Sequence, residues 1–96
     1  MIVLHIEHPI RDFAAWKAAF DRDPIDRERS GVRRYHILRP LDDPNYIMID
    51  LEFDNAGAAE AALAALRDVW RSPAVASALI GSPQIRLVEA VESKAY

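Results

Sequence analysis

The segment Tyr46–Phe53 alternates without a break between two kinds of residue, and this alternation constrains the fold more than any other feature. Its odd-numbered positions are apolar and its even-numbered positions are mixed: Ile47, Ile49, Leu51 and Phe53 against Tyr46, Met48, Asp50 and Glu52. Successive side chains of a strand point to opposite faces, so the segment predicts a strand with one buried face. Alternation recurs over residues 2–8, 32–39 and 85–92, which predicts three further strands.

Between these strands, apolar residues recur at helical spacing. The first helix is expected after the candidate N-cap Asp12, with three aromatic residues on one face: Phe13, Trp16 and Phe20. The second is expected after Asp54 or Asn55, with the apolar stripe Ala59, Leu63, Leu66 and Trp70. A proline after Ser72 predicts a short extra helix over residues 74–80 before the last strand.

The order of the elements predicts one ferredoxin-like α+β domain over residues 1–96, β-α-β-β-α-β with a four-stranded antiparallel sheet. Both crossovers are expected to be right-handed, so both long helices cover the same face of the sheet. The strand residues expected beneath the helices are Ile2, Leu4, Ile6, Ile47, Ile49, Leu51 and Phe53. Ninety-six residues leave no room for a second domain.

The opposite face of the sheet, called the outer face below, is expected to carry polar and apolar residues together. Its polar members are His5, Glu7, Arg34, His36, Asp50 and Glu52, and its apolar members are Val3, Val32, Leu38, Tyr46 and Met48. An antiparallel sheet can leave one face in water, but an apolar patch on a small protein is typical of an interface. We therefore expect a homodimer in which two sheets pair and enclose a cavity.

Composition narrows the choice of partner. Twelve basic and fifteen acidic side chains give a net charge of −3, which argues against a nucleic-acid or anionic-membrane partner. The absence of cysteine excludes disulfides and thiolate metal sites. The first apolar run is broken by His5, and no long apolar run follows, so we expect a cytoplasmic protein without a membrane partner.

Three segments carry a resemblance to a known superfamily. They are Asp12-Phe13-Ala14-Ala15-Trp16-Lys17-Ala18-Ala19-Phe20-Asp21, the Asp42-Asp43-Pro44-Asn45 run before the third predicted strand, and the short helix at residues 73–80. With them, the sequence resembles the dimeric α+β barrel superfamily over nearly its whole length. That superfamily includes antibiotic-biosynthesis monooxygenases, polyketide cyclases and muconolactone-isomerase-like proteins. The three segments specify scaffold, so the resemblance implies the fold and the dimer and leaves the reaction open.

His5, His36 and Asp50 form the candidate catalytic group, because the strands that carry them are expected to lie side by side. A hairpin register would bring His36 opposite Asp50, and such a pair would suit general acid–base work or a structural ion pair at the dimer interface. Two histidines and one carboxylate could also bind a metal, but strand spacing gives no diagnostic motif, so no metal is predicted. Haem-degrading relatives place a histidine on a helix, whereas all three histidines here fall in predicted strands.

The candidate substrate-binding residues are Arg34, Tyr46 and Met48. The guanidinium of Arg34 could hold an anionic substrate group or pair with Asp50 or Glu52. Tyr46 and Met48 would form an apolar wall. His8 is expected to face away from His5, and Trp16 and Trp70 are expected in the core, with a pocket for a planar ligand as the alternative.

These observations predict a homodimer that binds a small aromatic or polyketide-like molecule. The candidate chemistry is cofactor-independent monooxygenation, or cyclisation or isomerisation driven by proton transfer, with no cofactor. The alternative is a non-enzymatic dimer that binds a ligand or a protein and has no catalytic site.

Overall fold

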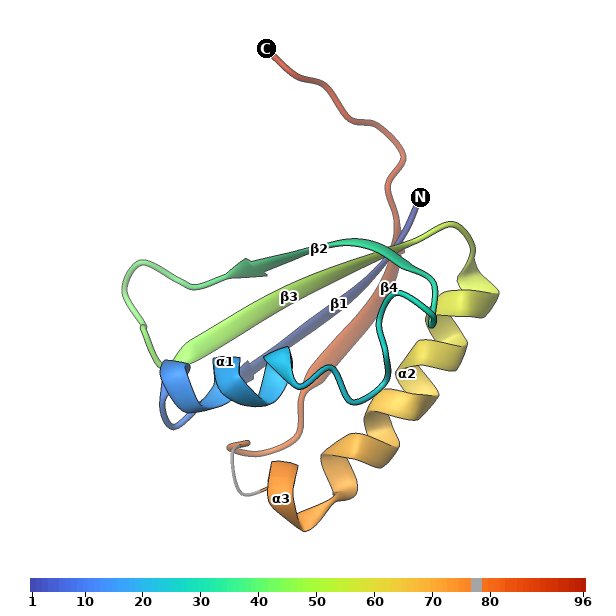
Figure 1. Cartoon of the computed structure of the whole chain (residues 1–96). Helices are drawn as coiled ribbons and strands as arrows, with labels where there is room; N and C mark the ends of the chain where they lie inside the picture. Colours follow the sequence, from blue (N-terminus) through green and yellow to red (C-terminus); the bar gives the residue numbers. More distant parts are fainter. Residues whose placement is uncertain (77–78) are drawn as a thin grey trace.

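The computed structural model describes residues 1–76 and 79–96. Its elements, in chain order, are β1 (Ile2–Pro9), α1 (Phe13–Asp21), β2 (Val32–Leu38), β3 (Tyr46–Phe53), α2 (Ala56–Arg71), α3 (Pro73–Ala76) and β4 (Gln84–Glu89). Figure 1 shows this β-α-β-β-α-β arrangement with the short α3 before the last strand. The predicted ferredoxin-like fold is confirmed.

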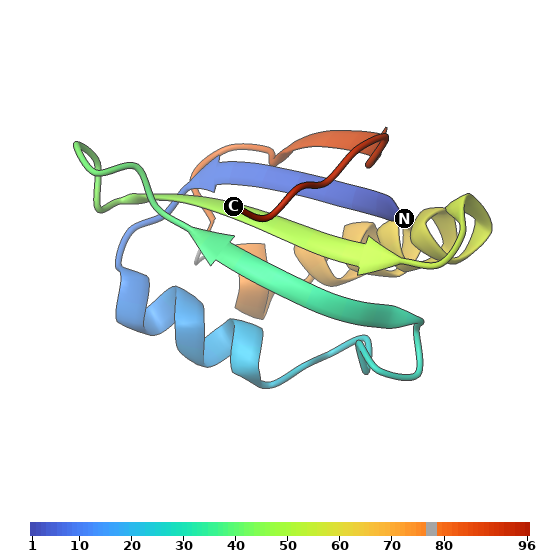
Figure 2. The same cartoon turned by 90° about the horizontal axis from the view of Figure 1, so that it is seen from above.

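The four strands form one antiparallel sheet in the order β2-β3-β1-β4. β1 and β3 are therefore central, and β2 and β4 form the edges, as Figure 2 shows. His5 lies opposite Asp50 on β3 and opposite Arg86 on β4. This register places the polar side chains of three strands in one row across the outer face.

The core lies between the sheet and its helices. The inward residues Leu4, Ile6, Ile47, Ile49, Leu51 and Phe53 are buried and pack with Trp16, Ala59 and Ala62 from the helices. The two helices begin at capped ends, because the side chain of Asp12 accepts from the Ala15 amide and that of Asn55 from the Ala58 amide. Asn55 is thus the second cap, rather than Asp54.

Four local predictions need correction. Val32 lies opposite Phe53 and packs against the core, because a register shift between Val32 and Arg34 turns it away from the outer face. β2 ends one residue earlier than predicted, at Leu38, and β4 ends at Glu89 rather than at residue 92. The short helix spans Pro73–Ala76; residues 77–78 of the predicted segment lie outside the described residues.

The C-terminal residues 90–96 follow β4 as an exposed, extended tail that leaves the body of the fold (Figure 1). The amide of Ala90 still donates to the carbonyl of Met1 at 2.9 Å, so the tail begins beside the N-terminus. Among the described residues, no helix has the length and the apolar character that crossing a bilayer would require.

Candidate functional site

The outer face holds a chain of hydrogen bonds centred on His5. Its Nδ1 lies 2.7 Å from Oδ1 of Asp50, and its Nε2 lies 2.7 Å from Oε2 of Glu7. The hydroxyl of Tyr46 donates to the other oxygen of Glu7 at 2.6 Å. These four side chains come from β1 and β3 and are all partly buried. The structure therefore brings together three predicted site residues and one residue, Glu7, that was not predicted as part of the site.

The contacts of His5 favour its charged form. An ionised carboxylate only accepts hydrogen bonds, so an imidazole with a carboxylate on each nitrogen carries a proton on both. The hydrogen bond to Glu7 is the largest cause that raises the pKa of His5; contact with Asp50 adds to it and burial opposes it. The Tyr46 hydroxyl and then His5 lower the pKa of Glu7, and the same hydroxyl contact raises the pKa of Tyr46.

His36 does not join this chain of hydrogen bonds. Its backbone lies opposite Asp50, as the hairpin predicts, but its Nδ1 lies 3.7 Å from Oε2 of Glu52. Arg34 holds the same carboxylate with Nε at 2.8 Å and Nη2 at 3.1 Å, which raises the pKa of Arg34 and lowers that of Glu52. Of the two partners that the sequence left open for Arg34, the structure selects Glu52.

A shallow groove of about 510 Å³ runs beside the His5 chain towards the β4 edge. Its lining is His5, Glu7, Gln84, Ile85 and Arg86. Arg86 lies opposite His5 and its charge contributes to the lowered pKa of Glu7. Sequence reasoning did not include Glu7 or Arg86 in the site. The alternation Val3, His5, Glu7 already places Glu7 on this face, whereas Arg86 requires the β1–β4 register.

A more enclosed cavity lies on the other face of the sheet, beneath the helices. It has a volume of about 80 Å³ and is partly open to solvent. Its lining is mainly apolar and aromatic and includes Ile6, Trp16, Phe20, Leu66, Trp70 and Leu79. Trp16 and Trp70 thus pack in the core, as predicted, and both also line this cavity.

His8 is a polar side chain of this cavity, and its Nε2 makes no hydrogen bond to the described residues. It is 2% exposed and lines the cavity next to Trp16, with the two rings 6.5 Å apart in an edge-to-face arrangement. Its Nδ1 lies 3.0 Å from the carbonyl oxygen of Pro9. Burial lowers the pKa of His8, and the Pro9 contact only partly opposes this. His8 faces away from His5, as predicted. The sequence did not predict that its side chain would then line a cavity.

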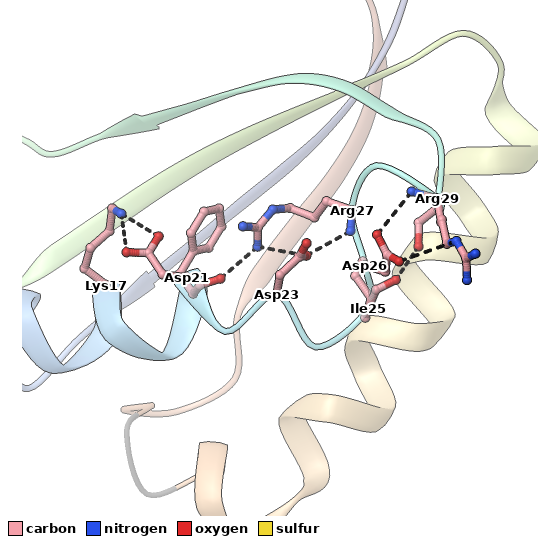
Figure 3. A network of polar contacts seen from close by, with 9 residues as sticks. Lys17, Asp21, Asp23, Ile25, Asp26, Arg27 and Arg29 are labelled. Atoms are coloured by element: carbon pink, nitrogen blue, oxygen red, sulfur yellow. Dashed lines mark hydrogen bonds and ion pairs between the residues drawn. The ribbon is translucent and has the colours of Figure 1, made fainter.

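Arg27 closes one side of the same cavity. Its Nη1 donates to the carbonyl of Phe20 at 2.9 Å and lies 3.5 Å from Oδ1 of Asp23 (Figure 3). The guanidinium also lies 3.9 Å from the centre of the Phe20 ring. These contacts hold its charge at the rim, in the loop between α1 and β2.

Comparison with known proteins supports the fold. The structure matches SnoaB from Streptomyces nogalater, a cofactor-independent oxygenase, with a TM-score of 0.75 and 18% identity over 96% of this chain and 94% of that one. A Nitrosomonas europaea protein, proposed to be an antibiotic biosynthesis monooxygenase, matches with a TM-score of 0.73 and 21% identity over 96% and 100% of the two chains. A dimeric ferredoxin-like protein from an uncultured marine organism has a TM-score of 0.66 and 13% identity, with 97% of each chain covered.

No protein-family model and no curated protein sequence matches the chain. At these identities, the likeness to the solved structures shows a shared fold. The chain therefore has the ferredoxin-like fold of antibiotic-biosynthesis-monooxygenase-like proteins, and its own residues must carry any argument about chemistry.

Proposed function

We propose that the chain binds a small aromatic molecule in the helix-covered cavity and acts on it without a cofactor. The proposed reaction is monooxygenation, or cyclisation or isomerisation driven by proton transfer. The observation that carries this proposal is an aromatic-lined cavity that contains one buried imidazole. Mostly apolar pockets with a few placed polar groups are typical of small-molecule sites. A cofactor-independent oxygenase among the structures of the same fold supports the reaction class.

The size of the cavity limits the ligand. At about 80 Å³ it is smaller than the ~300–1,000 Å³ of typical ligand pockets and than the roughly 150 Å³ engineered cavity that binds benzene. One ring can enter only with a small outward shift of its walls, and a larger polyketide-like molecule would extend through the open side. The buried part of the ligand is therefore a single ring.

The outer face is the proposed dimer interface. Met48 and Val3 lie half-buried among the His5 hydrogen bonds, and Leu38 and Val88 are exposed at the two edges by 48% and 42%. A second copy would cover these side chains, and the ion pairs already made on this face would enter the interface with their charges matched. One structure of the same fold is described as dimeric, which supports this assembly.

A second candidate places the chemistry on the outer face itself, with His5, His36 and Asp50 as proton carriers. Arg34, Tyr46 and Met48 would then contact the substrate. The observation that favours it is the imidazole of His5, which is held between two carboxylates beside a groove. Because these contacts keep His5 protonated, it would serve as an acid rather than as a base. If neither face acts on a ligand, the chain is a non-enzymatic dimer with satisfied ion pairs.

Binding can be tested by following the two tryptophan indole N–H signals in an NMR titration with single-ring compounds, since both tryptophans line the cavity. Ala19→Leu adds bulk to the cavity wall and should weaken binding about tenfold or more. The matched control is Ala18→Leu, at an exposed position of the same helix. Equal binding by the two variants would remove the cavity as the site.

Catalysis on the outer face has its own test. Once a substrate that is turned over has been found, the double variant His5→Ala, His36→Ala should abolish turnover if the second candidate is right. Unchanged turnover would reject proton transfer by these two residues and leave the helix-covered cavity as the reaction site. Circular dichroism and oligomeric state serve as controls for folding and assembly.

A further inference from the structure

We infer that Nε2 of His8 is a hydrogen-bond acceptor that selects ligands with a neutral ring hydroxyl, a phenol or an enol. This inference rests on the proposed function, because it assigns a specificity-determining residue to the same cavity. It concerns a histidine that the outer-face site does not use.

The first step is the tautomer of His8. A carbonyl oxygen can only accept a hydrogen bond, so the 3.0 Å contact with Pro9 requires a proton on Nδ1. The side chain is 2% exposed among apolar and aromatic neighbours, which disfavours a second proton. At neutral pH, Nε2 therefore carries a lone pair and no proton.

The second step is what this lone pair can bind. Among the described residues, Nε2 has no hydrogen-bond partner, and the ring lines the cavity. The described residues hold no fully buried side-chain nitrogen or oxygen without a partner, so Nε2 reaches the space of the cavity rather than being sealed in protein. A ligand that covers this acceptor without a donor would leave it unpaired at a cost in free energy, and a ligand with a hydroxyl donor at this point would avoid that cost. The surrounding Trp16, Phe20 and Trp70 rings favour a flat apolar body for the same ligand.

The third step excludes an anionic ring substituent. Of the described residues that line the cavity, His8 and Arg27 are the only two that ionise. Arg27 already contacts Asp23 and the Phe20 carbonyl, so its charge is largely compensated at the rim. A carboxylate inside the cavity would meet the lone pair of His8 without a free cation to balance it. A neutral hydroxyl suits the site, and a benzoate does not.

Three single-ring probes test the inference: phenol, toluene of nearly the same shape, and benzoate. Affinities are read from the tryptophan indole signals of the full chain at pH 7.5. His8→Asn keeps an amide that can donate to Pro9 but has no atom at the place of Nε2. His8→Gln is the matched control, because its longer side chain can put an amide oxygen near that place.

We expect the phenol-to-toluene affinity ratio to fall by about two- to tenfold in His8→Asn and to be kept in His8→Gln, as expected for one neutral hydrogen bond. Of the three probes, benzoate should bind wild type with the lowest affinity. A ratio that is the same in wild type and His8→Asn, while both rings still bind, would overturn the inference and leave the proposed function intact. Failure of all three probes to bind wild type would overturn both.

A direct observation guards against a variant that does not fold. In wild type with ¹⁵N-labelled histidine, His8 should show a protonated Nδ1 and a bare Nε2 at pH 7.5. Saturating phenol should move the Nε2 resonance towards that of a hydrogen-bonded nitrogen, and toluene should leave it in place. A protonated Nε2 in the free protein, or equal shifts with both probes, would contradict the assignment.

Discussion

His5 and His8 lie three residues apart on β1, yet the two faces of the sheet give them opposite properties. On the outer face, His5 contacts a carboxylate through each nitrogen, and its pKa is raised. Beneath the helices, the only hydrogen bond of the His8 side chain among the described residues is to the Pro9 carbonyl, and burial lowers its pKa. The same side chain is thus a cation on one face and a neutral acceptor on the other.

The difference follows from what surrounds each face. Strand alternation gives the inner face mainly aliphatic and aromatic residues around His8, and the helices cover most of it. The outer face keeps acidic partners within reach of each base, from neighbouring strands as well as from its own. Burial determines the protonation state of His8, and the neighbouring carboxylates determine that of His5. We expect the inner face to determine stability and the outer face to determine association.

The largest effect should come from truncating the inner face. Phe53→Ala removes a side chain that is fully buried on β3 and should lower the free energy of unfolding by about 3–5 kcal/mol. Met48→Ala, on the outer face of the same strand, is the matched control and should cost less, because Met48 is only partly buried. Urea denaturation of dilute protein measures both. Equal losses would show that the outer face contributes as much to stability as the inner one.

An intermediate effect should appear in the stability of the proposed dimer. Arg34→Ala leaves Glu52, whose side chain is 12% exposed, without the guanidinium that it contacts twice. In an interface this unpaired acid would be costly, so the dimer dissociation constant should rise several-fold. Arg33→Ala is the matched control, since Arg33 pairs with the half-exposed Asp54 instead. Analytical ultracentrifugation over a concentration series measures the dissociation constant of each variant. Equal changes in this constant for the two variants would exclude the outer face as the interface.

The sequence was sufficient for the fold because alternation and helical spacing are local signals. The six inward strand residues that form the core were all predicted from residue spacing alone. Val32 was placed on the wrong face because a β-bulge shifts the register by one residue, and the alternation in the sequence does not reveal it.

The candidate site was less predictable, for a different reason. Side-chain pairing across strands depends on rotamers as well as on register, so His36 lies opposite Asp50 and still turns towards Glu52. The cavity beneath the helices is formed by segments far apart in the sequence, including β1, α1, α2 and the loop that holds Arg27. Only the direction in which His8 points was available from alternation.

The smallest expected effect tests the two histidines directly through the pH dependence of stability. The folded-state pKa of His5 is raised above the ordinary value of 6.5, so its contribution to stability is full below pH 6.5 and is lost as the pH rises through the folded pKa. The lowered pKa of Glu7 keeps its carboxylate charged down to pH 4.5 and below. Wild type should therefore exceed His5→Gln in stability most clearly between pH 4.5 and 6.5.

His8 should show the opposite sign. Its folded-state pKa is lowered below 6.5, so the unfolded chain binds a proton more readily, and stability falls as the pH drops below 6.5. His8→Asn should lose this acid sensitivity, while His5→Gln should lose stability relative to wild type at pH 5.5 and little at high pH. For a partly exposed group such as His5, the difference should stay below about 1 kcal/mol. Urea denaturation at pH 5.5 and 9, at one protein concentration, measures the free energy of unfolding of wild type and of each variant. If both substitutions changed the stability at pH 5.5 relative to pH 9 in the same direction, the two faces would not impose opposite charge states on their histidines.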